Sequence, residues 1–579
     1  MKRYLKYVKP YISSFILGPL CMIIEVIGEV IMPFLLSKII DEGVAGQKGT
    51  AYIITMGIIM VITALTMMLG GVGGAYFAVK SSTGFANDLR KDLFSKIQRF
   101  SFANIDGFST GSLVTRLTND ITALQNIIQM FLRMALRSPG MLIGALIMAF
   151  TLNRKLASVI LIVVPILALT IFFIIKTAFP RFTIMQKKLD KLNVSVQENL
   201  TNIRVVKSFV REKYEEDKFT NISIDLKEKT LNAIKVMIFT MPVMTLAMNI
   251  TTLSVVWFGG NQIVLGNMTT GVLTAFINYV TQILMSLMMV SMIILNSSRA
   301  MASAKRINEV LDTEIDLTDD TASHKDAVVT EGKIEFKDVC FKYFKNNQKL
   351  VLDNINLTIN SGETVGIIGS TGSGKSSLVS LIPRLYDVDK GAVLVDGIDV
   401  RDYTLKNLRT GVGIVLQKNV LFSGSIKENL MWGDQSADDE TIATFADYAQ
   451  AHGFVEAFTD GYDTQLGQGG SNVSGGQKQR LCIARTLLKR PKILIFDDST
   501  SAVDTATEAK IRNSFNTDLK GMTKIIIAQR ISSVIDADKI VVIEDGKIVG
   551  IGKHSDLIDN CSAYTEIYYS QMDKKEAAQ

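Results

Sequence analysis

The chain has 579 residues, which is too long for one ordinary domain and long enough for two or three. Its mean hydropathy is positive, at +0.26, although 20% of the residues are charged, so we expect the apolar residues to be concentrated in one part of the chain. The three histidines and four widely spaced cysteines give no pattern for a histidine metal site, a metal cluster or a disulfide framework. The net charge of +6 favours anionic lipid over nucleic acid, so no nucleic-acid partner is predicted.

Six stretches in the N-terminal half are apolar enough to span a bilayer, which takes about 20 mostly apolar residues per helix. Because they lack the polar alternation of barrel strands, they predict a bundle of six transmembrane helices. The segment 2–9 has no signal-peptide pattern and is predicted to form a short helix on the cytoplasmic membrane face. The six stretches are residues 12–40, 52–79, 130–152, 156–177, 236–264 and 270–297.

Two of the connections between these spans are long, at residues 80–129 and 178–235, and both are rich in Lys and Arg. Such residues are in excess in cytoplasmic loops. We therefore predict that both connections and both termini are cytoplasmic, in a multi-pass protein of the plasma membrane. The heptad-like, charged sequence of the connections predicts helices that reach a cytoplasmic domain.

Charged residues within the predicted spans are costly and are therefore functional candidates. Glu25 and Glu29 lie four residues apart on one helix face, as do Arg133 and Arg137 in the third span. One interpretation is that the two acids line a cavity for cationic or amphipathic cargo, and the other is that acids pair with arginines to stabilise the bundle. The last span adds three candidates for the cavity, although its methionine is also common in membrane helices: Asn278, Gln282 and Met289.

Residues 331–572 have the alternating pattern of a soluble α/β domain and carry a GxxxxGKS motif between a predicted strand and a predicted helix. In this context the motif predicts a loop whose backbone N–H groups bind the phosphates of ATP. Lys375 is predicted to reach the β- and γ-phosphates, while Ser376 and Asp497, at the end of a later strand, bind Mg²⁺. The predicted loop residues are Gly369, Ser370, Thr371, Gly372, Ser373, Gly374, Lys375, Ser376 and Ser377.

A second motif precedes Asp497 and resembles the signature segment of the ATP-binding cassette (ABC) superfamily: Ser474, Gly475, Gly476 and Gln477. The resemblance implies that Tyr343 stacks on adenine, that Gln417 contacts Mg²⁺ and the attacking water, and that Asp504 belongs to the loop after the Mg²⁺-binding strand. Segments 108–120 and 198–209 also resemble the intracellular helices of ABC exporters, so the resemblance covers nearly the whole chain.

This resemblance implies a six-helix exporter-type transmembrane domain fused to a cytosolic α/β P-loop ATPase. We predict a transmembrane domain at residues 1–302, a linker at 303–330, the ATPase domain at 331–572 and a polar tail at 573–579. In this family each ATP lies between the P-loop of one cassette and the signature segment of another. The chain is therefore expected to act with a second half-transporter in the lipid bilayer.

Two positions depart from the family pattern at the same ATP site. The family has Glu after the Mg²⁺-binding Asp, whereas this chain has Asp498, whose carboxylate is one methylene shorter. A displacement of about 1 Å can lower a rate roughly a hundredfold. The family also has His in the switch loop, whereas Gln529 cannot become cationic. Asp498, Gln529 and Gln417 are therefore predicted to form a slow catalytic site beside an intact signature segment.

The closest resemblance is thus to the degenerate-site subunit of heterodimeric multidrug-type exporters, whose partner carries the catalytic Glu and His. We expect export of hydrophobic or amphipathic, drug-like molecules. The short segment before the first span predicts no processing of a peptide cargo by this chain. A lipid flippase, an importer with the exporter fold and a functional homodimer remain alternatives within the class. Outside the class, the alternatives are a DNA-acting ATPase and a gated channel.

Overall fold

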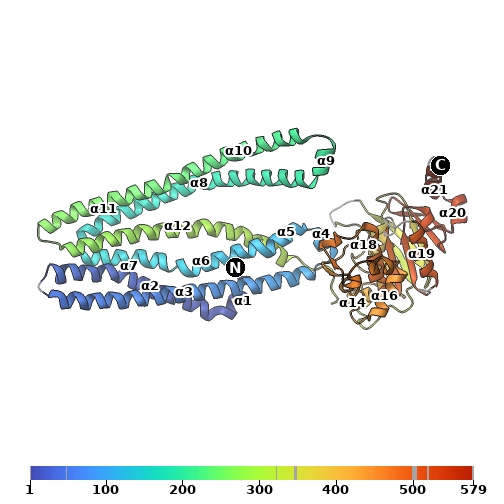
Figure 1. Cartoon of the computed structure of the whole chain (residues 1–579), viewed down its shortest axis with the longest axis horizontal. Helices are drawn as coiled ribbons and strands as arrows, with labels where there is room; N and C mark the ends of the chain where they lie inside the picture. The colour runs from blue at the N-terminus through green and yellow to red at the C-terminus, as the bar shows by residue number, and fades with distance from the viewer. Residues whose placement is uncertain are drawn as a thin grey trace. The chain divides into compact units, whose positions relative to one another are not determined.

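The computed structural model describes residues 2–46, 48–320, 322–344, 349–498, 505–517 and 521–576. The chain forms two compact units (Figure 1). The first contains Met1–Gln98 and Thr110–Asp312, and the second contains Arg99–Ser109 and Thr313–Gln579.

The first unit is helical throughout its described elements. Five of its helical stretches are long and apolar enough to cross a membrane: Leu5–Val44, Gly49–Gln98, Thr110–Leu152, Arg154–Thr201 and Thr270–Val290. The remaining predicted span, 236–264, is occupied by the end of α10 and by α11. The elements are η1 (Lys2–Tyr4), α1 (Leu5–Val8), η2 (Lys9–Tyr11), α2 (Ile12–Lys38), η3 (Ile39–Val44), α3 (Gly49–Gln98), α5 (Thr110–Thr115), η4 (Arg116–Asp120), α6 (Ile121–Met134), α7 (Arg137–Leu152), α8 (Arg154–Thr201), α9 (Ile203–Ser208), α10 (Glu212–Ile238), α11 (Thr240–Val264) and α12 (Thr270–Asp312).

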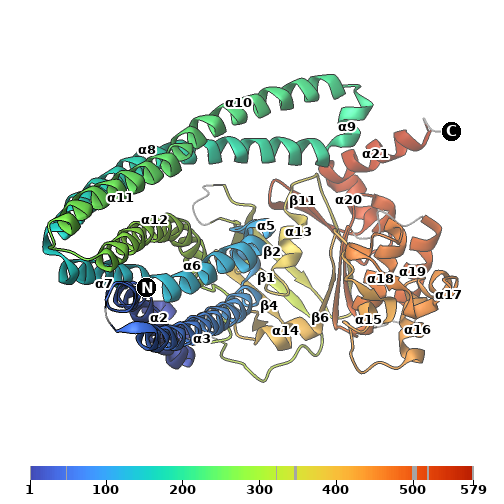
Figure 2. The same ribbon diagram turned by 60° about the vertical axis from the view of Figure 1, so that its left-hand side comes forward.

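Both long connections are helical, as predicted. Helix α3 continues without a break to Gln98, and α8 and α10 lie side by side with α9 joining their ends (Figure 1 and Figure 2). Helix α12 continues past residue 302 as far as Asp312.

Close packing of α2 against α3 depends on small residues. A Cβ atom on Gly70 would lie 2.9 Å from the carbonyl oxygen of Cys21, and one on Gly74 would collide with Met22. Glycine allows such a close approach of helices in a membrane, where packing rather than water exclusion drives association. The apolar core of this unit lies between α2, α7, α8, α11 and α12, and Tyr279 at its centre donates a hydrogen bond of 2.8 Å to the carbonyl oxygen of Val30.

The second unit is built on a six-stranded sheet with the order β12-β11-β3-β10-β9-β6 and a four-stranded sheet with the order β2-β1-β4-β5. The strands are β1 (Ile334–Phe341), β2 (Leu352–Ile359), β3 (Thr364–Ile368), β4 (Lys390–Val395), β5 (Ile398–Asp399), β6 (Val412–Val415), β7 (Gly424–Ser425), β8 (Gln465–Leu466), β9 (Ile493–Asp497), β10 (Thr523–Ile527), β11 (Lys539–Glu544) and β12 (Lys547–Gly552). The helices are α4 (Phe102–Asp106), α13 (Lys375–Ser380), α14 (Leu405–Gly411), α15 (Ile426–Leu430), α16 (Asp439–Tyr448), α17 (His452–Glu456), η5 (Gly461–Asp463), η6 (Gln468–Gly470), α18 (Gly475–Leu488), α19 (Thr505–Thr517), η7 (Ile531–Ser533), α20 (His554–Asn560) and α21 (Ser562–Glu576).

The parallel strands of the six-stranded sheet place the candidate site at one edge. Strands β9 and β10 are buried along their whole length, because a parallel sheet is covered on both faces and its strands are apolar runs. In the strand register Ile527 is aligned with Ile367 on one side and with Asp497 on the other. The carboxyl ends of β3, β9 and β10 therefore meet, and the segments that follow them lie together.

Candidate functional site

The loop after β3 has the tight curl that a phosphate-binding loop requires. Gly374 has a φ of +100°, and a Cβ atom there would lie 2.9 Å from the carbonyl oxygen of Val351. A Cβ atom on Gly369 would collide with the carbonyl oxygen of Ile543. Only glycine fits both positions, because it alone tolerates this backbone conformation and this close approach without strain. Residues 370–372 form the exposed tip of the loop.

Lys375 follows the loop at the start of α13, and its ammonium group lies over the loop. Its Nζ atom donates hydrogen bonds to the carbonyl oxygens of Gly369, at 2.8 Å, and Ser370, at 2.7 Å. Burial lowers the pKa of Lys375, and the nearby carboxylates of Asp498 and Asp497 oppose this shift. A half-buried cation held at the loop is suited to binding the phosphates of a nucleotide.

Two of the three residues predicted to contact Mg²⁺, Ser376 and Asp497, lie in direct contact. The Ser376 hydroxyl donates a hydrogen bond of 2.7 Å to a carboxylate oxygen of Asp497. Asp497 is buried, and this burial, reinforced by the charge of Asp498, raises its pKa. Mg²⁺ prefers a few oxygen ligands from the protein and takes the rest from phosphate and water. The Ser376 hydroxyl and the Asp497 carboxylate therefore fit this ion, because a bound cation would offset the repulsion between the carboxylates of Asp497 and Asp498.

The three predicted catalytic residues, Gln417, Asp498 and Gln529, also come together. One carboxylate oxygen of Asp498 accepts a hydrogen bond of 2.6 Å from the Gln529 side-chain amide and a longer one of 3.3 Å from that of Gln417. Asp498 has a φ of +47°, in the left-handed region that Asp tolerates better than most residues. The carboxylate is thus held between two neutral amides.

Gln571 is a site residue that the sequence reasoning missed. From α21, its side-chain amide donates a hydrogen bond of 2.8 Å to the carbonyl oxygen of Gln529, and its oxygen accepts one of 3.0 Å from the backbone N–H of Ile531. The switch loop is therefore held in place by the last helix of the described chain. No motif around Gln571 indicates this role, because the contact depends on how α21 packs.

Tyr343, the predicted adenine-stacking residue, lies beside the phosphate-binding loop. Its hydroxyl group is 2.7 Å from the hydroxyl of Ser377, and its exposed fraction is 36%. Its ring packs edge-on against that of Tyr386, with the centroids 5.2 Å apart. Sequence reasoning missed Tyr386, which belongs to no motif. Tyr343 therefore combines a fixed position with an accessible ring face.

The signature segment lies at the start of α18 and consists of Ser474, Gly475, Gly476 and Gln477. Ser474 and Gln477 cap this helix reciprocally, through hydrogen bonds of 2.9 and 3.2 Å. Among the described residues, no hydrogen bond or ion pair joins this segment to the phosphate-binding loop. Asp504, the remaining predicted nucleotide contact, lies outside the described residues.

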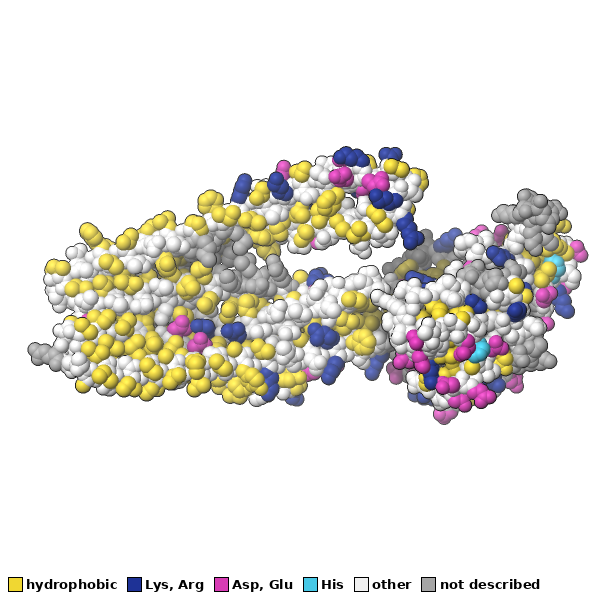
Figure 3. Space-filling view, viewed as in Figure 1, with side chains coloured by type: hydrophobic (Ala, Val, Ile, Leu, Met, Phe, Trp, Pro, Cys, Tyr) yellow, Lys and Arg dark blue, Asp and Glu magenta, His cyan; other side chains and the backbone are white. Residues whose placement is uncertain are grey.

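Three charged residues of the membrane helices, Glu25, Glu29 and Arg137, form one group. Arg137 lies 3.2 Å from a carboxylate oxygen of Glu25 and 3.3 Å from one of Glu29, and charged side chains interrupt the hydrophobic surface of this unit (Figure 3). The alternative in which the acids pair with an arginine is therefore confirmed for Arg137, whereas Arg133 is exposed. Of the other cavity candidates, Gln282 donates a hydrogen bond of 2.9 Å to the backbone of Glu29.

The other two cavity candidates make no such link. Asn278 is exposed and donates to its own helix, at Thr274, and Met289 is half-buried. Their place in a cargo cavity remains a prediction.

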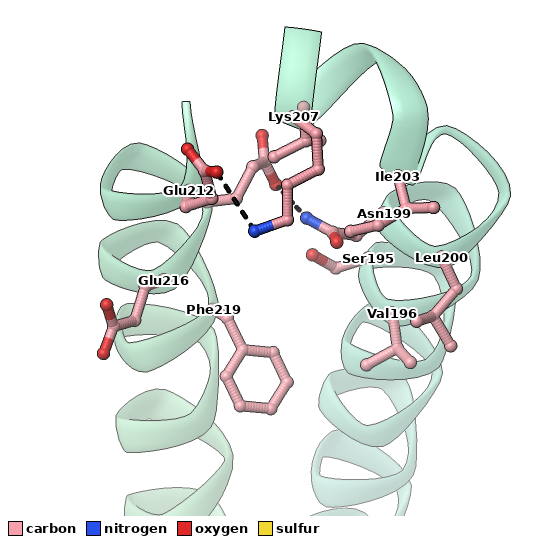
Figure 4. A pocket seen from close by; sticks show the side chains of 11 residues that line it. Ser195, Val196, Asn199, Leu200, Ile203, Lys207, Glu212, Glu216 and Phe219 are labelled. Carbon is pink, nitrogen blue, oxygen red and sulfur yellow. Dashed lines mark hydrogen bonds and ion pairs between the residues drawn. The ribbon is translucent and has the colours of Figure 1, made fainter. Parts of the chain in front are cut away.

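The tip of the α8–α10 hairpin encloses a small hollow of about 260 Å³ (Figure 4). Lys207 pairs with Glu212 at 3.0 Å across its mouth, and Asn199 donates a hydrogen bond of 3.2 Å to Glu215 (Figure 4). Beside these polar contacts, Phe209 is 73% exposed. The tip is thus held by its own polar contacts and leaves an apolar side chain exposed.

Comparison with known proteins agrees with this geometry. The family profile of the ABC transporter transmembrane region matches residues 15–287, and that of the ABC transporter ATPase, described as "ABC transporter", matches residues 352–501. The chain is 39% identical over 576 residues to the uncharacterized ABC transporter ATP-binding protein YfiB of Bacillus subtilis, and the match covers 99% of each chain.

Two further relatives have names that refer to cargo. YgaD of Bacillus subtilis, whose name assigns it to multidrug export, is 32% identical over 585 residues, with 99% of both chains covered. The ATP-dependent lipid A-core flippase of Syntrophus aciditrophicus is 30% identical over 576 residues, covering 99% of this chain and 94% of that protein. Among solved structures, a bacterial Atm1-family ABC exporter with ATP bound has a TM-score of 0.78 at 25% identity, covering 98% of this chain and 99% of the other.

Proposed function

Because the chain belongs to the ABC transporter family, we propose that it is the subunit with the impaired ATP site in a heterodimeric exporter of hydrophobic or amphipathic molecules. The chain is an ATP-hydrolysing exporter half-transporter of the plasma membrane, and its ATPase domain is cytosolic.

The pairing of Asp498 with Gln529 carries the proposal. A carboxylate acting on the attacking water must reach it and accept its proton. Asp498 is one methylene shorter than the family's Glu, and its oxygen already accepts hydrogen bonds from Gln529 and Gln417. Gln529 also cannot supply the positive charge of a protonated histidine. Both features slow hydrolysis at this site without weakening ATP binding.

Each remaining site residue has a role in holding ATP. Lys375 would bind the β- and γ-phosphates, and Ser376 with Asp497 would hold Mg²⁺, which supplies charge neutralisation at the phosphates. Tyr343 would stack on the adenine. The segment Ser474–Gln477 would complete the competent site on the partner chain. ATP bound at this chain's own site would then act mainly as a long-lived bridge between the two cassettes.

The test of the asymmetry is ATP turnover by the purified chain in lipid discs, alone and with the partner. We expect little turnover alone and a sharp rise with a partner that carries the catalytic Glu and His. The double variant Asp498→Glu, Gln529→His should raise the turnover of the chain alone by about tenfold or more, since each change restores a missing group. Lys375→Ala in that background is the control and should abolish the gain.

Brisk turnover of the unmodified chain alone, abolished by Lys375→Ala, would overturn the proposed asymmetry. It would mean that Asp498 and Gln529 suffice for hydrolysis and that the chain functions as a homodimer. A double variant no faster than the unmodified chain would also refute the reasoning, because the two substitutions would not be the cause of the slow rate.

The proposed cargo is supported by the charge of the membrane group. Glu25 and Glu29 carry two negative charges against the single positive charge of Arg137, which leaves excess negative charge to attract a cationic amphipath. We expect Glu25→Gln with Glu29→Gln to reduce uptake of a lipophilic cationic dye into inverted vesicles. Glu42→Gln, which removes a half-buried acid paired with Lys38 and Lys48, is the matched control. Undiminished dye transport by the double variant would eliminate the role of the acids.

Lipid flipping is the second candidate, favoured by the similarity to the lipid A-core flippase. It predicts that a fluorescent phospholipid is moved between leaflets of proteoliposomes in an ATP-dependent manner with no drug present. Absence of that movement alongside active dye transport would decide for small-molecule export.

A further inference from the structure

A short segment from the N-terminal half of the sequence folds with the ATPase unit. Residues Arg99–Ser109 lie between α3 and α5 in the chain, yet they group with Thr313–Gln579. The five-residue helix α4 at the centre of this segment is fixed at its start, because Ser101 and Asn104 cap it reciprocally. Asn104 also donates a hydrogen bond of 3.1 Å to the carbonyl oxygen of Glu314. The helix is therefore held firmly within the second unit.

Helix α4 contacts one aromatic residue of the ATP site. The hydroxyl of Tyr386 donates a hydrogen bond of 2.8 Å to the carboxylate of Asp106, at the end of α4. The ring of Phe102, at the start of α4, has its centroid 6.0 Å from that of Tyr386. Both ends of the helix thus meet the same tyrosine, one through a hydrogen bond to a charged group and one through ring packing.

The same tyrosine leads directly to the nucleotide site. Its ring packs edge-on against Tyr343, at an interplanar angle of 86°, and both rings pack against the buried ring of Phe341. The hydroxyl of Tyr343 lies 2.7 Å from that of Ser377, in α13. A continuous series of contacts therefore runs from Asp106 through two tyrosines to the helix that follows the phosphate-binding loop.

We propose that Tyr386 is a positioning residue that couples the segment Arg99–Ser109 to the adenine-stacking face of Tyr343. The inference rests on the proposed assignment of Tyr343 to adenine. A displacement of α4 moves the hydroxyl and ring of Tyr386, and because the two tyrosine rings meet edge to face, it changes the orientation of the ring that stacks on the base. Linkage makes the effect reciprocal, so ATP on Tyr343 also restrains α4.

The protonation of Tyr386 suits this role. Burial, followed by the hydrogen bond to Asp106, raises the pKa of its hydroxyl. The hydroxyl therefore keeps its proton throughout the physiological pH range and remains a donor to the Asp106 carboxylate.

Tyr386→Phe tests the coupling, because it keeps the ring and removes the hydroxyl. The full-length protein in lipid discs would be examined by deuterium exchange of the peptide that covers residues 99–109, with and without Mg·ATP. We expect ATP to protect this peptide from exchange in the unmodified protein. In Tyr386→Phe we expect most of that protection to be lost. We also expect ATP affinity, measured by displacement of a fluorescent nucleotide, to fall about fivefold, the lower end of typical coupling between sites.

Three further variants separate coupling from a structural role. Asp106→Ala should reproduce Tyr386→Phe, whereas Asp106→Asn keeps an acceptor oxygen and should retain most of the protection. Tyr403→Phe is the matched control, because Tyr403 is a buried tyrosine of the same unit that donates a hydrogen bond of 3.0 Å to the carbonyl oxygen of Val395, away from α4. It should leave both readouts unchanged.

The outcomes distinguish failure of the coupling from failure of the ATP site. If ATP protects residues 99–109 equally in Tyr386→Phe and in the unmodified protein, the inference is wrong. Tyr343→Ala tests the assignment on which it rests. Unchanged ATP affinity in Tyr343→Ala would remove the proposed adenine contact, whereas weakened affinity there with no effect of Tyr386→Phe would remove only the coupling.

Discussion

Replacement of Arg137 by Met isolates the contribution of the charged group in the membrane helices. The guanidinium of Arg137 lies 3.2 Å from Glu25 and 3.3 Å from Glu29. The exposed fractions of the three side chains are 25%, 16% and 24%. The substitution would leave two carboxylates on the same face of α2 with no positive partner.

The expected loss of stability follows from this burial. Removing one member of a buried ion pair costs about 3–5 kcal/mol, whereas an exposed pair contributes about 0–1 kcal/mol. The group of Arg137 is mostly covered, so we expect a loss of about 2–4 kcal/mol. The triple variant Glu25→Gln, Glu29→Gln, Arg137→Met removes every charge of the group together and should lose no more than about 1 kcal/mol, since no unpaired charge remains.

Thermal unfolding of the purified protein in detergent measures the difference. Arg137→Met should unfold at a clearly lower temperature than both the unmodified protein and the triple variant. Arg133→Met is the matched control, because Arg133 lies near the end of the preceding helix, α6, and is exposed. If Arg137→Met and Arg133→Met have the same midpoint, or if the triple variant is the least stable, the acids do not depend on Arg137 for their stability in the membrane.

Three further predictions concern the ATP site. Gly374→Ala should weaken ATP binding about 5- to 30-fold in a fluorescent-nucleotide titration, because a left-handed backbone costs an L-residue roughly 1–2 kcal/mol. Asp497 has a raised pKa, so the stability associated with its neutral form is present below its unfolded pKa and is lost as the pH rises through the folded pKa. Asp497→Asn should therefore raise the unfolding midpoint of the nucleotide-free protein at pH 7.5 while abolishing Mg²⁺-dependent ATP turnover. Gln571→Ala should speed deuterium exchange at Gln529 and its neighbours, whereas Ser570→Ala should not.

The features that were predictable from the sequence are those that depend only on neighbouring residues in the chain. Apolar runs of sufficient length predict membrane helices because each helix satisfies its own backbone in lipid. The glycines and Lys375 predict a phosphate-binding loop because the backbone conformation itself demands glycine. These patterns need no knowledge of which elements pack together, and the helical membrane unit and the strand–loop–helix around Lys375 were accordingly predicted.

Contacts between distant residues were not predictable in this way. The sequence left open whether Glu25 and Glu29 face a cavity or an arginine, because the answer depends on how α7 packs against α2. It likewise gave no reason to associate Tyr386 with Asp106 or Gln571 with the switch loop, since neither pair belongs to a motif. The membership of α4 in the ATPase unit likewise depends on tertiary packing.

In the proposed heterodimer, the catalytic pair Asp498 and Gln529 and the signature segment at Ser474 serve different ATP sites. One chain could therefore lose hydrolysis at its own site while its partner's site stays active. In the proposed heterodimer Asp498 and Gln529 would act on the nucleotide bound at this chain's own Lys375, and the two residues are hydrogen-bonded to each other. Ser474 and Gly475 are instead exposed at the start of α18, and Gly476 and Gln477 are half-buried there. In the proposed heterodimer they act on the nucleotide of the partner, so substitutions at residues 498 and 529 slow one site while the other keeps a complete set of groups. Selection can therefore maintain the signature segment while the local catalytic pair diverges.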